Sequence, residues 1–143
     1  MAKQQTDASR LTTQFVDAHR LIKKGDVAGL RRMLEHGVSS KLLNRFSWTL
    51  LMLSAVEGNS RIGELLIANG ADLDKANDIG ETALSLAAHK GHLRFVRLLL
   101  SAGASTECQP HGHSLDEWVT ISSGLSREKI DSILSLIHRT RLN

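Results

Sequence analysis

The hydrophobic and polar positions of this chain fall into short blocks with helical spacing, separated by glycines. The clearest block spans residues 80–104, where two stretches rich in leucine and alanine lie on either side of Gly91 and end at Gly103. Thr82 can cap the first stretch through its hydroxyl group, and each glycine can take the left-handed conformation that ends a helix. The block therefore predicts two short antiparallel helices. Helices of this length are marginal in water, so they require neighbours of the same kind.

Such neighbours recur along the chain at a constant interval. Gly25, Gly58, Gly91 and Gly124 follow one another at equal steps, and the apolar positions around Gly58 and Gly91 keep the same step. The positions of the earlier block that match the later one are Thr49, Leu51, Leu53, Ala55, Gly58, Arg61, Leu65, Leu66, Gly70 and Ala71. A helix-pair unit that repeats at this interval predicts a solenoid, in which each unit buries its apolar face against the next.

The repeated unit resembles the ankyrin repeat. That family combines a turn containing Asp and Gly with a Thr-Pro-Leu-His segment, an Ala-Ala pair, Gly-His, a run of leucines and Gly-Ala-Asp. Residues 77–109 carry most of this pattern, residues 44–76 match it well, and residues 13–43 and 110–140 match it loosely, as terminal units usually do. The resemblance implies an all-α solenoid of about four helix-turn-helix units, with short β-hairpin-like loops projecting from it. The fold implies no single activity.

The two ends of the chain are expected to cap a single domain. Residues 1–12 are polar and lack periodicity, so we predict a frayed tail there and a first helix that begins near Thr12 or Thr13. In the C-terminal unit the register slips by about one residue, and Ser126 is predicted to cap the last helix. That helix carries an apolar stripe formed by Ile130, Ile133, Leu134 and Ile137.

Two positions of the unit 44–76 depart from the family pattern, and a third position is unusual for a helix. Ser47 stands where the projecting turn has glycine, which predicts a positive φ at some energetic cost. Leu50 takes the place of the proline that starts the first helix. Gly63 lies inside the second helix, where glycine costs up to about 1 kcal/mol relative to alanine, and its small size predicts a close contact with another helix.

The composition favours an intracellular helical domain. The 143 residues include one proline and one cysteine, and aromatic residues make up 3%. A single cysteine excludes an internal disulfide and favours a reducing compartment. No apolar run approaches the roughly 20 residues of a membrane span, and the first residues lack the apolar core of a signal peptide. We therefore expect a cytoplasmic or nuclear location and no membrane partner.

The net charge of +3 raises the alternative of a nucleic-acid or other acidic partner. Basic residues gather at Lys23 and Lys24, at Arg31 and Arg32, and in residues 138–141. Acidic residues are interspersed throughout, and no basic and aromatic pattern accompanies the basic groups, which favours a solvated surface. Nucleic acid is therefore not the expected partner.

Candidate binding residues follow from the resemblance, which implies that a partner protein binds in the concave groove between the projecting loops and the exposed ends of the first helices. Phe46 and Trp48 lie at a predicted loop tip, where large exposed aromatic side chains are typical of binding hot spots. With Val56 and Ile79 they would form an apolar patch. The alternative is that Phe46 or Trp48 folds down onto the preceding turn. The predicted partner-binding residues are Arg45, Phe46, Trp48, Met52, Val56, Glu57, Asp78, Ile79, Glu81, Ser85, His89, Lys90, His111 and His113.

Catalytic and metal-binding chemistry finds little support in the sequence. It contains no phosphate-binding loop, Gly-x-Ser-x-Gly, His-Glu-x-x-His or dinucleotide-binding glycine motif. The spacing of Cys108, His111 and His113 is similar to that of zinc ligands. No fourth ligand is close in sequence, so we expect no metal and no other cofactor. For His92, which follows Gly91, the resemblance implies a structural role in bonds between repeats.

These observations together predict a non-catalytic protein–protein interaction module. A stack that holds its groove rigid before binding loses little ordering entropy on association. Phe46 and Trp48 would anchor the partner, and charged side chains around them would select its register. The alternative from another class is a structural protein that forms a homo-oligomer through the same aromatic patch.

Overall fold

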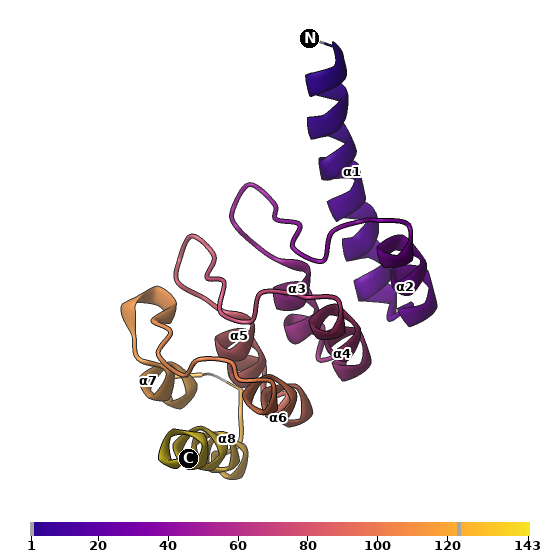
Figure 1. Cartoon of the computed structure of the whole chain (residues 1–143). Helices are drawn as coiled ribbons and strands as arrows, with labels where there is room; N and C mark the ends of the chain where they lie inside the picture. The colour runs from indigo at the N-terminus through magenta and orange to yellow at the C-terminus, as the bar shows by residue number, and fades with distance from the viewer. Residues whose placement is uncertain (1, 123) are drawn as a thin grey trace.

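A computed structural model describes residues 2–122 and 124–143, and these residues form a stack of helix pairs (Figure 1). The elements are α1 (Ala2–Lys24), α2 (Val27–Glu35), α3 (Leu50–Glu57), α4 (Ser60–Ala68), α5 (Ala83–Lys90), α6 (Leu93–Ser101), the 3₁₀ helix η1 (Pro110–Gly112), α7 (Leu115–Thr120) and α8 (Arg127–Leu142). Within the described ranges, pairing of β type is limited to one isolated bridge between Leu43 and Thr49. The predicted all-α solenoid is confirmed.

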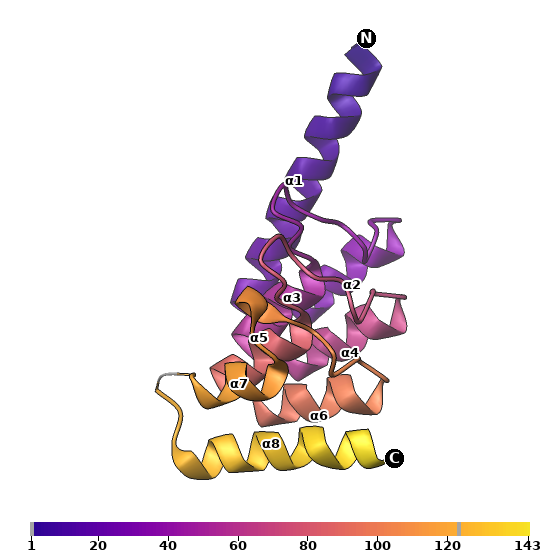
Figure 2. The same cartoon turned by 90° about the vertical axis from the view of Figure 1, so that its left-hand side faces the viewer.

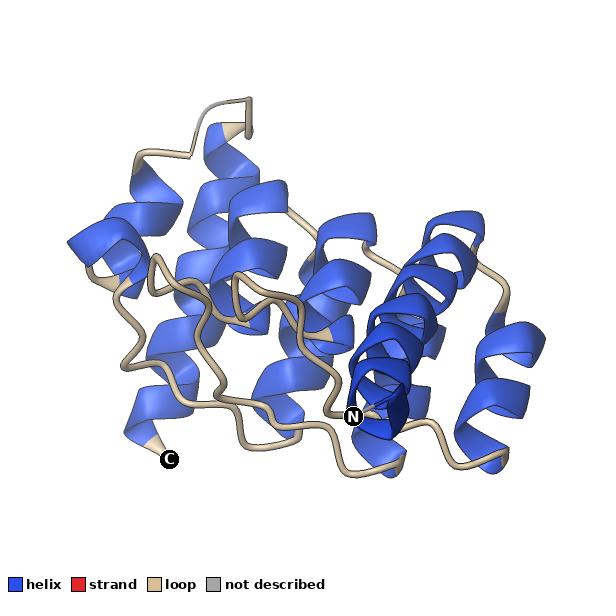
Figure 3. Cartoon of the chain, turned by 90° about the horizontal axis from the view of Figure 1, so that it is seen from above, coloured by secondary structure: helices blue, strands red, loops and turns tan. Residues whose placement is uncertain are grey.

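The helices stand in two rows (Figures 1 and 3). Helices α1, α3, α5 and α7 pack side by side in one row, and α2, α4, α6 and α8 form the other. Each helix of the first row also packs against the helix that follows it in the chain. The loops before α3, α5 and α7 project from the same side of the molecule, and the N-terminal half of α1 extends beyond the stack on that side (Figures 1 and 2).

Glycines at the predicted interval mark the same place in successive units. Gly58 and Gly91 are the C-caps of α3 and α5, with φ angles of +73° and +76°. Gly25 and Gly124, one interval before and after, also have positive φ angles of +72° and +88°. The repeat is therefore present in the backbone as well as in the sequence.

The contacts between units explain why some of these positions require glycine. His92 lies against Gly58 of the preceding unit, and a Cβ atom there would come within 2.6 Å of the His92 ring. The Nε2 atom of His92 is 3.0 Å from the carbonyl oxygen of Val56, which confirms the structural role predicted for this histidine. Gly63 makes the predicted close helix contact, because a Cβ atom there would lie 2.8 Å from the ring of Phe95 on α6.

One apolar core runs through the whole stack. Fully buried side chains are contributed by every unit, among them Ile22, Leu30, Leu51, Leu66, Leu84, Leu99, Leu115 and Ile133. Burial of one such side chain contributes about 1.5–3 kcal/mol. On α8, Ile133 and Ile137 are fully buried while Ile130 and Leu134 are half-buried, so the predicted stripe closes the core. In the described part of the chain, none of the helices has both the length and the apolar character needed to span a bilayer.

The predicted frayed tail at residues 1–12 is wrong for residues 2–12, because α1 begins at Ala2. Thr12 and Thr13 do not cap the helix. Their hydroxyl groups donate to the carbonyl oxygens of Ala8 (3.0 Å) and Ser9 (2.9 Å), one turn earlier in the same helix. The segment before them contains no glycine or proline, so nothing local ends the helix there.

The C-terminal unit keeps the helix-pair form despite its loose sequence match. Ser114 caps α7 and lies one position short of a full repeat interval after Thr82, the cap of α5, so the predicted slip in register is confirmed. Ser126 caps α8, where its hydroxyl oxygen accepts a hydrogen bond from the backbone N–H of Lys129 (3.2 Å). This unit therefore closes the stack at the end opposite to α1.

Candidate protein-binding surface

The candidate surface is built on the three projecting loops, which we call the first finger (residues 43–49), the second finger (76–82) and the third finger (109–114). In the first finger, the side-chain oxygen of Asn44 accepts hydrogen bonds from the backbone N–H groups of Phe46 and Trp48, both at 2.9 Å. The backbone N–H of Asn44 donates to the carbonyl oxygen of Trp48 (3.1 Å). One side chain thus holds the whole loop in shape.

The second finger repeats this construction. The side-chain oxygen of Asn77 accepts from the backbone N–H groups of Ile79 (3.1 Å) and Glu81 (2.9 Å). Gly80 takes the left-handed position of the turn, with φ +80°, where the first finger has Ser47 with φ +63°. The positive φ predicted for Ser47 is therefore confirmed.

Backbone hydrogen bonds tie the fingers to one another. The N–H of Asp78 in the second finger donates to the carbonyl oxygen of Phe46 in the first (3.2 Å), and the N–H of His111 in the third donates to the carbonyl oxygen of Ile79 (2.8 Å). Figure 3 shows the three loops side by side. The fingers therefore form a connected row rather than three independent loops.

The finger tips present apolar side chains to solvent. Phe46 is 51% exposed and Ile79 is 48% exposed, as predicted. The guanidinium carbon of Arg45 lies 4.7 Å from the centroid of the Phe46 ring, in a cation–π arrangement. Trp48 is different, since it is half-buried and packs against the core, so the alternative of a packed aromatic side chain describes it better.

Three residues predicted to line the groove are buried instead. Met52 and Ser85 occupy the third position of their helices, where the side chain points back to the cap. The Ser85 hydroxyl accepts from the N–H of Thr82 (2.9 Å), and the Met52 sulfur lies 3.5 Å from the N–H of Thr49. The third, Glu81, is only 7% exposed. These three residues are therefore not available to a partner at the surface.

Glu81 is buried because the third finger folds against it. Its carboxylate accepts a hydrogen bond from the side-chain amide of Asn77 (2.9 Å) and lies 3.5 Å from Nε2 of His111. A buried carboxylate requires such partners, since an unpaired buried charge is costly. Glu81 therefore holds the second and third fingers together.

The remaining predicted residues stay accessible. Val56 and His89 are half-buried, and the exposed members of the set, besides Phe46 and Ile79, are Arg45, Glu57, Asp78, Lys90, His111 and His113. They are spread over the three fingers and the ends of α3 and α5. The structure thus keeps eleven of the fourteen predicted residues at least partly open to solvent, and three in the interior.

An aromatic cluster at the third finger was not predicted. The imidazole rings of His89 and His111 both stack on the indole of Trp118, with ring centroids 4.7 Å and 4.8 Å from it. His89 comes from α5, His111 from η1 and Trp118 from α7. The three residues belong to different elements, so no local spacing in the sequence brings them together.

The hydrogen bonds around His89 show which of its ring nitrogens carries the hydrogen. The hydroxyl group of Ser122 donates its single hydrogen to the carbonyl oxygen of Trp118 (2.8 Å), so it accepts from Nδ1 of His89 (2.7 Å). Burial lowers the pKa of His89, and the positive charge of Lys90 lowers it further. In the neutral ring Nε2 is therefore a hydrogen-bond acceptor.

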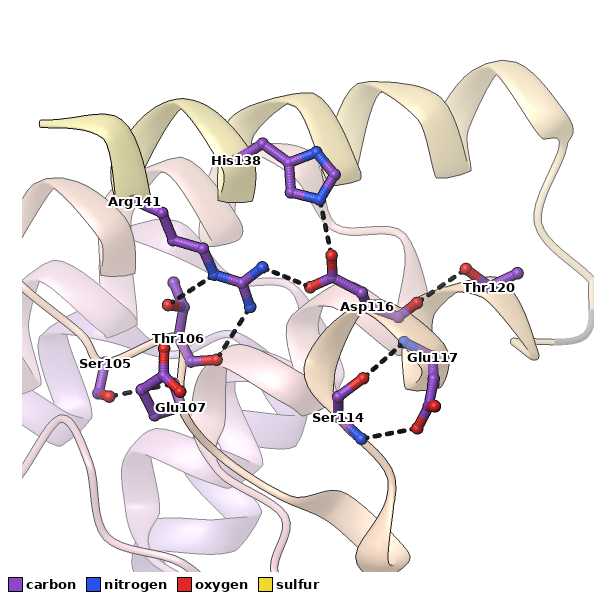
Figure 4. A network of polar contacts seen from close by, with 9 residues as sticks. All are labelled: Ser105, Thr106, Glu107, Ser114, Asp116, Glu117, Thr120, His138 and Arg141. Carbon is purple, nitrogen blue, oxygen red and sulfur yellow. Dashed lines mark hydrogen bonds and ion pairs between the residues drawn. The ribbon is translucent and has the colours of Figure 1, made fainter.

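A polar network joins α8 to the rest of the stack (Figure 4). The carboxylate of Asp116 lies between Nε2 of His138 (2.6 Å) and Nη1 of Arg141 (2.8 Å), and Arg141 also donates from Nε to the hydroxyl of Thr106 (3.1 Å). Burial raises the pKa of Asp116, but the hydrogen bond from His138 and the charge of Arg141 outweigh burial, so the pKa lies below its ordinary value. These contacts fix the last helix and have a structural role.

The cysteine and histidines with zinc-like spacing do not assemble into a metal site in the described residues, which contain no group of three or more His, Cys, Asp or Glu placed to hold an ion. Cys108 is half-buried, and burial raises the pKa of its thiol. A raised pKa keeps the thiol protonated and therefore poorly nucleophilic. His111 instead contacts Trp118 and Glu81.

Comparison with known families agrees with this architecture. A sequence model described as ankyrin repeats, three copies, matches residues 18–109, which is more than half of the 143 residues. The chain belongs to the ankyrin repeat family. Its members are generally protein–protein interaction modules and are typically non-catalytic. A search of curated proteins found no match to the chain.

Proposed function

We propose that this chain is a non-catalytic module that binds another protein through its finger tips and the adjoining concave face. The observation that carries the proposal is the pair Phe46 and Ile79. These two large, half-exposed apolar side chains lie on neighbouring fingers that are joined by a backbone hydrogen bond. Apolar side chains displayed together at a surface are typical of binding sites, because a partner that covers them removes them from water.

The connected row of fingers supports binding with little loss of conformational freedom. Asn44 and Asn77 fix the two loops internally, and the bond between Asp78 and Phe46 fixes them relative to one another. A surface that is ordered before binding avoids part of the entropy cost of association. The finger tips are therefore suited to act as anchors.

Polar groups around the anchors supply selectivity. Arg45 and Asp78 lie next to the apolar tips and carry opposite charges, so they favour one register of a charged partner over others. At the other end of the surface, the acceptor Nε2 of neutral His89 suits a hydrogen-bond donor of the partner. The surface therefore combines an apolar centre with polar margins.

The test compares the wild-type chain with a Phe46→Ala, Ile79→Ala double variant. A partner captured with the wild-type chain is identified, and its affinity for both proteins is measured by calorimetry. We expect the double variant to lose about 2 kcal/mol or more of binding free energy, the loss typical of hot-spot residues, while its helical circular dichroism is unchanged.

Leu142→Ala provides the matched control. Leu142 is also apolar and is 87% exposed, but it ends α8, in the row of helices that carries no finger. The control variant should bind with wild-type affinity. Full affinity in the double variant would show that the finger tips do not anchor the partner.

A further inference from the structure

We propose that the cleft between α1 and the first finger binds a partner segment in which a large apolar side chain is flanked by carboxylates. This inference rests on the proposed function, since it names the class of segment that the surface holds at its N-terminal edge. The cleft involves residues of α1 that do not belong to the predicted groove.

The cleft is a cavity of about 470 Å³, within the range of about 300–1,000 Å³ typical of ligand pockets. Both walls are held in place. Phe15 of α1 is buried in the core, and Asn44 fixes the first finger through its side-chain hydrogen bonds. The lining residues are Thr12, Phe15, Val16, His19, Leu43, Asn44, Arg45 and Phe46.

Exposed apolar side chains gather at this cleft. Val16, Leu43 and Phe46 line it and are 49%, 44% and 51% exposed, and Leu11, one turn before Phe15 on α1, is 51% exposed. In the described ranges, these four are the majority of the seven large apolar side chains that are exposed. A concentration of this kind at one edge of a molecule marks an interaction site, whereas exposed apolar residues scattered singly need no explanation.

The shape of α1 explains why the patch is uncovered. Phe15, Ala18 and Ile22 form a buried stripe where α1 packs against α2 and α3. Leu11 continues this stripe at helical spacing but is 51% exposed, and the N-terminal half of α1 extends beyond the stack (Figures 1 and 2). The extended half of α1 therefore forms a wall beside the fingers, with its apolar side chains available to a partner.

The charge at the cleft identifies the partner's chemistry. The ionisable side chains that line it are His19 and Arg45, and no carboxylate is among the lining residues described. Arg20, beside His19, is paired with Asp17 on α1 (3.3 Å). Arg45 takes part in no ion pair within the described residues and lies over the Phe46 ring. A carboxylate beside the apolar side chain would complement this guanidinium, which favours bidentate pairing with carboxylates.

A second copy of the chain is a poorer occupant. In a two-fold symmetric dimer the same patch meets itself, so Arg45 of one copy would approach the basic cleft of the other. Like charges brought together at an interface are unfavourable. The cleft therefore favours a different molecule, with acidic and apolar side chains.

The test starts from an unbiased probe. The full chain is immobilised and exposed to a phage-displayed library of random linear peptides, and enriched sequences are synthesised for affinity measurement by fluorescence anisotropy. We expect enriched peptides to carry Leu, Ile, Phe or Met with Asp or Glu beside it. Absence of enrichment, or enrichment of basic or uncharged peptides, would overturn the proposal.

Variants then locate the binding site. Val16→Ser replaces an apolar side chain in the wall of the cleft with a polar one. Arg45→Gln removes the positive charge of the guanidinium with little change in side-chain size. Each should weaken peptide binding at least fivefold, while Ile121→Ser, a change of the same kind at the far end of the stack, should leave binding unchanged. Unchanged circular dichroism confirms that each variant remains folded.

The outcomes separate this proposal from the proposed function. If Phe46→Ala and Ile79→Ala abolish peptide binding but Val16→Ser does not, the cleft proposal fails and binding at the finger tips stands. If Val16→Ser and Arg45→Gln weaken binding while Ile79→Ala does not, the cleft proposal is supported on its own. A dimer seen by light scattering that Val16→Ser dissociates would assign the cleft to a second copy and overturn the proposal.

Discussion

Two asparagines, Asn44 and Asn77, hold the loops that present the candidate surface. Each side-chain oxygen accepts two backbone N–H groups of its own loop, from the residues two and four positions later. Their separation equals the repeat interval, which is visible in the sequence and indicates equivalent positions. Residue type and spacing do not reveal that each asparagine would accept twice, because that depends on the loop conformation.

The buried members of the predicted site show the limit of reasoning from spacing. Met52 and Ser85 fall at the third position after their caps. Position in the helix does not by itself rule out that such a side chain is exposed to solvent. Their side chains turn inward because they complete the cap with Thr49 and Thr82. Glu81 is buried by the third finger, whose course the loose sequence match of the last unit did not predict.

Exchanging the residues of the two turns tests how the fingers are held. Gly80 and Ser47 occupy equivalent left-handed positions, but a Cβ atom at Gly80 would clash with the backbone oxygen of Gln109. We expect Gly80→Ser to lower the free energy of unfolding by about 2 kcal/mol or more, because the left-handed conformation alone costs about 1–2 kcal/mol for a residue with a side chain. Denaturant unfolding measures this change.

Ser47→Gly is the reciprocal variant. Glycine takes the left-handed conformation without steric cost but loses more freedom on folding, so the change in the free energy of unfolding should lie between zero and a gain of about 1 kcal/mol. Equal destabilisation by both substitutions would contradict the assigned turn geometry.

At the scale of helices, the sequence predicts most starts and ends correctly. Thr49, Thr82 and Ser126 act as caps, and the glycines end helices where expected. The start of α1 was missed because Thr12 and Thr13 are good caps by residue type. Whether a threonine caps a helix or bonds within it depends on the residues before it, and here the helix continues back to Ala2.

The docking of α8 should depend on pH through Asp116. The pKa of Asp116 in the folded protein lies below its ordinary value. Its contribution to stability is therefore fully present above the unfolded-state pKa and is lost as the pH falls through the lowered folded-state pKa. We expect the melting temperature of the wild type to exceed that of Asp116→Asn at neutral pH, and the difference to shrink below about pH 4, where an unperturbed aspartate titrates.

Asp131→Asn, on α8 itself, is the control, because Asp131 is exposed and makes no ion pair within the described residues. Its melting temperature should differ little from that of the wild type across this range. A difference between wild type and Asp116→Asn that grows on acidification would show that the carboxylate does not stabilise the docked helix.

At the scale of the whole molecule, repetition explains both what the sequence predicts and what it does not. Apolar residues at a fixed interval predict the stack, because each unit must bury its face against the next. The stacking of His89 and His111 on Trp118 joins three elements and follows only from their packing. The cleft beside the first finger likewise depends on how far α1 extends past the stack.

The central claim is that the fingers form a rigid, connected row before any partner binds. Residue-resolved amide hydrogen exchange in the free protein tests it most directly, at the N–H groups of Asp78 and His111, which donate to Phe46 and Ile79 of the preceding fingers. We expect both amides to exchange more slowly than unstructured peptide amides, because each is hydrogen-bonded to the preceding finger. Exchange of both at the unprotected rate would show that the fingers move independently and that the surface is not preformed.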